Sequence, residues 1–153
     1  MASIANLQRI SAAKLSGLLL AEQSGDPTIA VIDVRDDDHI GGHIKGSMHV
    51  PSRTLDAMLP TIIRKLQDKK TIVFHCALSQ QRGPGAALRY LRERDHILGN
   101  KQKSTTDKDG ADPVEQRVYV LDRGFVGWQE VYGKDERLTE GYRKDLWEDG
   151  YWG

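Results

Sequence analysis

The part of this sequence best equipped for chemistry is FHCALSQQRGP, residues 74–84. It contains Cys76, the single cysteine of the chain, and Arg82, with five residues between them. A thiolate is a strong nucleophile, and a guanidinium is a forked donor that matches two oxygens of a tetrahedral anion. The pair therefore indicates a thiol site built around an oxyanion. The alternative is a small buried cysteine at the end of a strand.

The spacing also predicts a part for the backbone. If residues 77–82 form a tight loop, their N–H groups point into one concavity, and such a nest binds anions. Gly83 and Gly85 leave the loop exit free of bulk, and Pro84 is a favourable residue for starting a helix. The positive end of that helix would face the same anion and favour the thiolate form of Cys76. The expected anion-binding residues are Ala77, Leu78, Ser79, Gln80, Gln81 and Arg82.

Three short apolar runs must position this loop. They are IAVIDV (29–34), TIVFH (71–75) and RVYVL (117–121), which are rich in β-branched residues and nearly continuous, as in strands buried on both faces. Helical patterns separate them, and this alternation predicts an α/β domain with a mostly parallel central sheet. Ligands of such sheets bind beyond the carboxyl ends of the strands, where Cys76 follows TIVFH.

Segments with helical periodicity lie between the predicted strands. Ser11 can cap a helix over residues 12–22, and we expect Pro60 in the first turn of the next helix. A third helix is expected from Pro84 to about Arg94, and GGHIKGSMHVP (41–51) is typical of a turn, a short strand and a turn. The side chains expected on apolar helix faces are Leu15, Leu18 and Leu19; Leu55, Met58, Leu59, Ile62, Ile63 and Leu66; Ala87, Leu88 and Leu91; and Phe125, Trp128, Val131 and Tyr132.

The composition limits the classes of protein to which this chain can belong. The chain has 153 residues, with 22 basic and 22 acidic side chains and no net charge, so nothing favours nucleic acid or an anionic membrane as a general partner. No apolar run is long enough to span a bilayer, and no signal peptide is expected. A single thiol can form neither an internal disulfide nor a cysteine-rich zinc site, which predicts a reducing, intracellular location.

HCALSQQRGP resembles the HC-x5-R signature of cysteine-dependent phosphatases. Within that group it is similar to the rhodanese-fold branch of cell-cycle dual-specificity phosphatases and eukaryotic arsenate reductases, and most of all to the small plant and fungal members. IDVR (32–35) and GGHIKGSMHVP resemble the DVR and GHI-GS-H-P segments of that fold. VLDRGFVGW (120–128) resembles its late L-x-GG-x-x-W segment, with Arg123 in place of a first glycine.

The resemblance covers residues 10–132 and implies a fold: a rhodanese-like domain with a mostly parallel five-stranded sheet and helices on both faces. We expect the chain to be one such domain over residues 1–153. It would carry a polar, mobile insertion over 95–116 and an aromatic tail over 133–153. Trp147 and Trp152 in that tail would cover an apolar surface or meet a partner.

The resemblance also implies an activity. Sulfurtransferases of this fold have a loop one residue shorter, whereas phosphatases and arsenate reductases have the seven-residue loop seen from Cys76 to Arg82. The expected function is hydrolysis of phosphotyrosine or aryl phosphates through a thiophosphate on Cys76, without a cofactor, in the cytoplasm and also the nucleus. Arsenate reduction with external glutathione and glutaredoxin is the alternative. The second alternative is a module that binds an anion or a partner without turnover.

Other residues are expected to support or adjoin the loop. His75 points opposite to Cys76 on its strand, so it should hydrogen-bond the loop rather than act as a base. Ser79 would donate to the sulfur, to a bound oxygen or within the loop. The resemblance implies that Asp33 and Arg35 form a structural ion pair or anchor a loop, although either could also touch the site. The acidic run Asp36, Asp37 and Asp38 would supply a general acid or be solvated turn residues, and His39, His43 and His49 are not expected to converge on a metal.

Overall fold

The computed structural model describes residues 7–22, 28–36, 39, 41–79, 81–105 and 116–148. Strands and helices alternate along the chain as the sequence predicts. The strands are β1 Gln8–Ile10, β2 Ile29–Asp33, β3 His43–Ile44, β4 Met48–His49, β5 Thr71–His75, β6 Arg117–Leu121 and β7 Thr139–Glu140. The helices are α1 Ala12–Ala21, the short 3-10 helix η2 Ser52–Thr54, α2 Leu55–Lys65, α3 Arg82–Thr105, α4 Gly124–Tyr132 and α5 Lys144–Glu148.

Five strands form one sheet in the order β1-β6-β5-β2-β4, and every pairing in it is parallel. The predicted α/β fold with a five-stranded sheet is therefore confirmed. The segment 41–51 differs in detail, because it forms two short strands instead of one. Of these, β4 joins the main sheet, whereas β3 pairs antiparallel with β7 in a separate two-stranded sheet.

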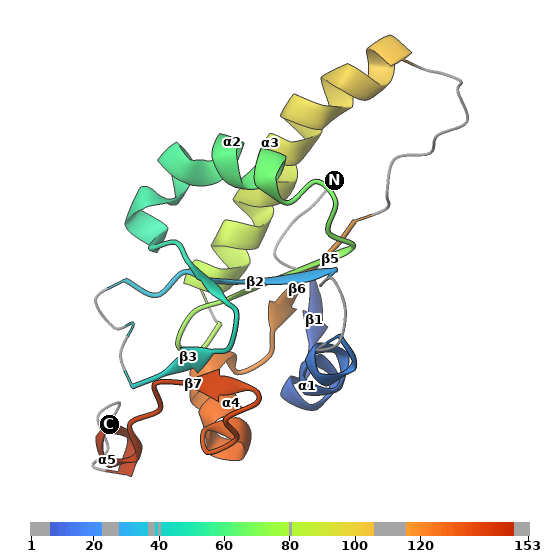
Figure 1. The fold of residues 1–153 in the computed structure, drawn as a ribbon. Helices are drawn as coiled ribbons and strands as arrows, with labels where there is room; N and C mark the ends of the chain where they lie inside the picture. The colour runs from blue at the N-terminus through green and yellow to red at the C-terminus, as the bar shows by residue number, and fades with distance from the viewer. Residues whose placement is uncertain are drawn as a thin grey trace.

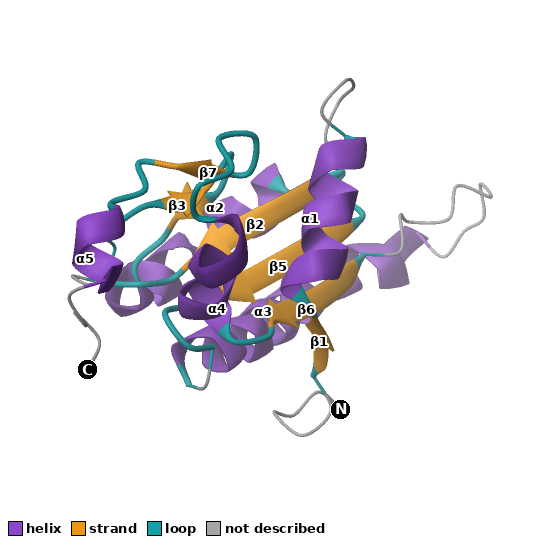
Figure 2. Cartoon of the chain, turned by 90° about the horizontal axis from the view of Figure 1, so that it is seen from below, coloured by secondary structure: helices purple, strands orange, loops and turns teal. Residues whose placement is uncertain are grey.

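Helices cover both faces of the sheet, as expected. In Figures 1 and 2, α2 and α3 lie on one face, and α1 and α4 lie on the other. Successive residues of a strand point to opposite faces, so Phe74 of β5 enters one apolar core and Val73 enters the other. Both positions must be apolar, which explains why the strand sequences do not alternate. The first core includes Ile32, Leu59, Phe74 and Ala87, and the second includes Leu15, Val73, Leu121 and Trp128.

The predicted cap of α1 is confirmed, because the Ser11 hydroxyl oxygen accepts a hydrogen bond from the Lys14 N–H at 3.1 Å. The apolar face of this helix is narrower than expected. Leu15 is fully buried, but Leu18 is 36% exposed. Similarly, Val131 of α4 is 67% exposed instead of lying on the buried face with Phe125.

The prediction for Pro60 is wrong. The helix α2 begins at Leu55, directly after η2, so Pro60 is its sixth residue and not part of its first turn. A proline in a helix interior removes one hydrogen bond and costs about 3 kcal/mol. The burial of Leu55, Leu59 and Ile62 outweighs that cost, since each such side chain contributes about 1.5–3 kcal/mol when buried.

The helix α3 differs from the prediction at both ends. It begins at Arg82 instead of Pro84, which is possible because the first N–H groups of a helix need no partner within it. It also continues past Arg94 to Thr105, so the first part of the expected insertion 95–116 is helical (Figure 1). Ile97 packs against the first core and helps to explain this extension. Residues 106–115 lie outside the described part of the chain.

The elements after residue 133 were not predicted, but they explain one aromatic residue of the expected tail. Trp147 of α5 donates from Nε1 to the Gly41 carbonyl at 2.9 Å, and its ring centroid lies 5.7 Å from that of Phe125. Trp147 therefore covers an apolar surface of its own chain, while Trp152 lies outside the described residues. None of the helices described is long and apolar enough to cross a membrane.

Candidate active site

Cys76 directly follows β5, at the start of the loop that leads into α3. The residue is 4% exposed, and its Sγ accepts a hydrogen bond from the Ser79 N–H at 3.2 Å. Ser79 has a φ of +56°, in the left-handed region that residues other than glycine rarely adopt. This conformation curls the loop back so that a backbone donor points at the sulfur.

The first half of the loop is held from behind by α4. The Phe125 N–H donates to the Cys76 carbonyl at 3.0 Å, and the Val126 N–H donates to the Ala77 carbonyl at 2.9 Å. In a planar trans peptide the N–H points opposite to the C=O. The N–H groups of Ala77 and Leu78 are therefore turned away from α4. Contacts that fix the loop thus also direct two amide donors to the side where an anion could bind.

Gly124 makes this close approach of α4 possible. Its φ is +56°, and a Cβ at this position would lie 2.5 Å from the carbonyl oxygens of both Cys76 and Ala77. Arg123, which stands where the family segment has a glycine, also has a positive φ of +66°. Its Cβ lies 2.5 Å from where a Cβ of residue 127 would be, so Gly127 accommodates the Arg123 side chain.

Arg82 lies at the start of α3 and contacts Asp36, which lies in the segment that follows β2. The distance from Arg82 Nη1 to Asp36 Oδ2 is 3.3 Å, and the two side chains are 34% and 22% exposed. The carboxylate also accepts hydrogen bonds from the Ser52 hydroxyl at 2.5 Å and the Arg53 N–H at 3.1 Å. Burial raises the pKa of Asp36, but these hydrogen bonds and Arg82 together lower it below its usual value of 3.8.

The remaining loop residues occupy different environments. Leu78 is 48% exposed, and the Gln81 carbonyl accepts a hydrogen bond from the Gly85 N–H at 2.8 Å as α3 begins. The Ser79 hydroxyl is buried and has no hydrogen-bond partner within the part of the chain that the structure describes. Gln80 lies outside that part, as do Asp37 and Asp38.

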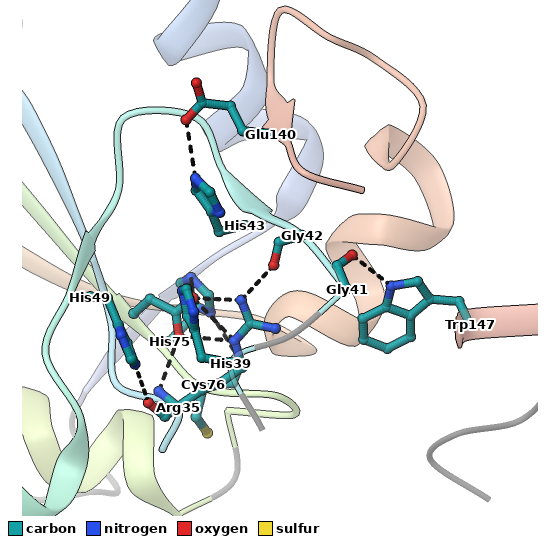
Figure 3. Close-up of polar contacts among 11 residues, drawn as sticks. Arg35, His39, Gly41, Gly42, His43, His49, His75, Cys76, Glu140 and Trp147 are labelled. Atoms are coloured by element: carbon teal, nitrogen blue, oxygen red, sulfur yellow. Dashed lines mark hydrogen bonds and ion pairs between the residues drawn. The ribbon is translucent and has the colours of Figure 1, made fainter. Parts of the chain in front are cut away.

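Asp33 and Arg35 form a buried ion pair beside the loop. Arg35 also acts as an anchor, and Figure 3 shows its contact with Gly42. Arg35 donates to the Asp33 carboxylate from Nε at 3.0 Å and from Nη2 at 2.7 Å, and both side chains are fully buried. Nη2 also donates to the Gly42 carbonyl at 2.8 Å, and the guanidinium lies 4.3 Å from the Phe125 ring centroid. Arg35 therefore contacts the same helix, α4, that holds the Cys76 loop.

His75 connects this pair to the loop. Its Nδ1 lies 3.0 Å from the Cys76 carbonyl oxygen, and its Nε2 lies 3.8 Å from Asp33 Oδ2. Burial raises the pKa of Asp33, but His75 and Arg35 outweigh it and hold the value at about 2. Burial also lowers the pKa of His75 below its usual value of 6.5, although Asp33 and the contact with the Cys76 carbonyl oppose this shift. His75 thus contacts the loop backbone, as the sequence predicts.

Three histidines stack near this ion pair (Figure 3). The ring centroid of His39 lies 3.7 Å from that of His49 and 5.7 Å from that of His43. No group of three or more His, Cys, Asp or Glu residues in the described ranges is placed to hold a metal ion. The further polar partners of His39, His43 and His49 are the Asp33 carboxylate, the Glu140 carboxylate and the Arg35 carbonyl, respectively.

Arg9 was not among the predicted site residues. It lies on β1, at the far edge of the sheet, and its Nη1 donates to the Ser79 carbonyl at 3.2 Å. The same nitrogen lies 3.7 Å from Asp122 Oδ1. The sequence gives little sign of this contact, because a strand of three residues with two exposed positions has no clear periodic pattern.

Known proteins share this fold. The family model of the rhodanese-like domain matches residues 18–131. Arsenate reductase 2.1 of Oryza sativa subsp. japonica is 41% identical over 121 residues, which cover 78% of this chain and 66% of the rice protein. Dual specificity phosphatase ibp1 of Schizosaccharomyces pombe is 36% identical over 140 residues, which cover 90% of this chain and 99% of the yeast protein.

Solved structures agree with the sequence comparisons. A yeast protein tyrosine phosphatase of the rhodanese family superposes with a TM-score of 0.72 at 34% identity, and the match covers 95% of this chain and 99% of that one. The family model covers most of the chain, and the relatives carry the names of phosphatases and arsenate reductases. This protein belongs to the rhodanese-like family, with Cdc25-like phosphatases and arsenate reductases as its homologues.

Proposed function

We propose that this protein is a cysteine-dependent phosphatase that hydrolyses phosphotyrosine or aryl phosphate esters. The observation that carries this proposal is the hydrogen bond of 3.2 Å from the Ser79 N–H to Cys76 Sγ. It lies inside a seven-residue loop that ends at Arg82. An N–H donor favours the thiolate, which is the reactive form of cysteine. Relatives named as phosphatases support the same reading.

The proposed reaction has two steps. The Cys76 thiolate attacks phosphorus, a sulfur–phosphorus bond forms, and the bond to the aryl oxygen breaks. Arg82 and the loop N–H groups hold the remaining phosphoryl oxygens through both steps. Water then attacks phosphorus, which releases inorganic phosphate and restores the thiolate. Positioning and charge stabilisation supply most of the catalysis.

Asp36 has a specific part in this proposal. Its lowered pKa keeps the carboxylate ionised at neutral pH, so it does not protonate the leaving group. Aryl esters suit such a site, since a phenolate leaves with less help from an acid than an alkoxide does. Instead, Asp36 sits beside Arg82, where its negative charge opposes an incoming dianion.

Asp36→Asn should therefore tighten the binding of inorganic phosphate. The asparagine oxygen can still accept from the Arg53 N–H, and its amide NH2 can donate to the Ser52 hydroxyl oxygen, but the substitution removes one negative charge near the anion. We expect the dissociation constant to fall about 3- to 10-fold at low ionic strength, measured by isothermal titration calorimetry. The basic limb of the pH–kcat profile should stay in place. Loss of that limb would instead identify Asp36 as the general acid.

Arsenate reduction is a second candidate, favoured by the 41% identity to a protein named as an arsenate reductase. In this reaction Cys76 would form an adduct with arsenate, and external thiols would reduce it. The chain has one cysteine and cannot form an internal disulfide. Glutathione and glutaredoxin are therefore the proposed reductants for this alternative, whereas the phosphatase reaction needs no cofactor.

One comparison tests the proposal. The purified protein and Cys76→Ser are assayed with an aryl phosphate, with arsenate plus glutathione and glutaredoxin, and with thiosulfate plus cyanide. We expect aryl phosphate turnover that Cys76→Ser abolishes, with similar thermal melting of both proteins. Turnover of arsenate alone would favour the second candidate. Inactivity in all three assays, together with tight phosphate binding, would favour a binding module without turnover.

A further inference from the structure

We propose that Arg9 is a positioning residue of the Cys76 loop, which holds the Ser79 carbonyl so that the Ser79 N–H stays directed at the sulfur. This inference rests on the proposed role of Cys76 as the nucleophile. It assigns a function to an edge strand that contributes no other residue to the site.

The contact joins two distant parts of the chain. Arg9 pairs with Val120 in the parallel ladder between β1 and β6, which places its backbone near the carboxyl ends of the strands. From there Nη1 donates to the Ser79 carbonyl at 3.2 Å, across 70 positions in sequence. Hydrogen bonds from a charged donor are roughly twice as strong as those between neutral groups.

Ser79 needs such a contact because its backbone is unfavourable by itself. A left-handed conformation at a residue other than glycine persists only when surrounding contacts hold it, and here φ is +56°. The Ser79 hydroxyl has no partner among the described residues, so it does not supply that support. The N–H is committed to Cys76 Sγ, and the carbonyl is the remaining backbone group that can anchor the residue.

The two halves of the loop therefore have separate supports. The N-terminus of α4 holds the carbonyls of Cys76 and Ala77, and Arg9 holds the carbonyl of Ser79. The charge of Arg9 also adds positive potential near the loop. That effect is reduced because the side chain is 43% exposed and faces Asp122 at 3.7 Å. We thus expect geometry to be the main contribution of Arg9.

The test compares Arg9→Met, Arg9→Gln, Arg9→Lys and the control Asp122→Asn. Asp122→Asn removes the other partner of Arg9 without changing its contact with Ser79. Three quantities are measured: the pH dependence of Cys76 alkylation by iodoacetamide, the affinity for inorganic phosphate, and kcat/KM with an aryl phosphate. Thermal melting of each variant reports on the fold.

For Arg9→Met we expect the midpoint pH of alkylation to rise by about one unit and kcat/KM to fall about 10-fold, as for the loss of one charge-assisted hydrogen bond. Arg9→Lys should partly restore the midpoint pH and kcat/KM of the wild type. For Asp122→Asn, kcat/KM should stay within about twofold of the wild type, because an exposed ion pair contributes little. Arg9→Gln keeps a shorter, neutral donor and replaces Arg9→Met in the comparison if the latter fails to fold.

Two results would overturn the proposal. One is an alkylation profile that Arg9→Met, or Arg9→Gln in its place, leaves unchanged. The other is a change no larger than that caused by Asp122→Asn. A failure of the proposed function is distinguishable from both, because it would leave the wild type without turnover of aryl phosphate. The alkylation profiles of the same proteins would still decide the role of Arg9.

Discussion

Replacing Arg35 with leucine should lower the free energy of unfolding by about 3–5 kcal/mol, the usual cost of removing one partner of a buried ion pair. The substitution leaves the Asp33 carboxylate fully buried without its cationic partner. It also removes the hydrogen bond to the Gly42 carbonyl and the contact with the Phe125 ring. Urea denaturation of wild type and variant at pH 7 measures the difference.

The pH dependence of this loss has a definite sign. In the wild type the pKa of Asp33 is lowered from 3.8 to about 2, so the stability it contributes is present above pH 4 and is lost as the pH falls toward 2. In Arg35→Leu, burial would dominate and raise that pKa. The variant should then lose stability as the pH rises above about 4. A stability difference of equal size at pH 4 and pH 7 would contradict this account.

Arg137→Leu is a matched control within the same chain. Arg137 and Asp135 repeat the Asp-x-Arg arrangement, with hydrogen bonds from the backbone N–H, Nε and Nη2 of Arg137 at 3.0, 3.1 and 2.9 Å. However, the Arg137 side chain is 65% exposed. Water can solvate Asp135 after the substitution, so we expect little change in stability. Similar losses in both variants would show that burial is not the deciding factor.

Gly124→Ala should reduce kcat/KM about 100-fold, since displacement of a reacting group by about 1 Å has an effect of that size. The added Cβ would lie 2.5 Å from the carbonyl oxygens of Cys76 and Ala77, so the loop or the start of α4 has to move. Steady-state kinetics with an aryl phosphate and inorganic phosphate binding measure the effect. Formation and hydrolysis of the thiophosphate both depend on this loop, so we expect both steps to be slower in the variant.

Gly46→Ala is a control that separates the steric clash at residue 124 from the strain of a left-handed backbone. Gly46 also has a positive φ, of +80°, but a Cβ there would meet no atom within 4 Å. Its replacement should cost about 1–2 kcal/mol of stability for the left-handed backbone and should leave kcat/KM unchanged. If Gly124→Ala loses no more activity than Gly46→Ala, the packing of α4 against the loop does not position Cys76.

Strong local signals explain what the sequence could predict. The strand at Thr71–His75 is a compact apolar run, and Ser11 is a favourable cap placed directly before a helical pattern. The family segments predicted that Asp33 and Arg35 would form an ion pair or anchor a loop, and the apolar run at 71–75 predicted that the Cys76 loop would follow a strand. These features depend on neighbours in sequence or on a motif, so they can be read without knowing the fold.

Features that depend on distant contacts could not be read in this way. Pro60 lies inside α2 because the burial of apolar residues on both sides of it outweighs its local preference. The helix α3 runs past Arg94 into a polar stretch in which Ile97 packs against the core. Arg9 donates to the Ser79 carbonyl across 70 positions in sequence, and Asp36 accepts from Arg82 across 46. No period or composition marks such contacts.

The supports of the Cys76 loop also have a consequence for local unfolding. Its backbone is tied to β1 through Arg9 and to α4 through Phe125 and Val126. A loop held by separate elements does not open as a small independent fluctuation; it opens when a larger cooperative unit opens. Slow hydrogen exchange of the Ser79 amide would be the signature of this behaviour. A related chain could keep the HC-x5-R motif and still lose the site if these distant elements were loosened.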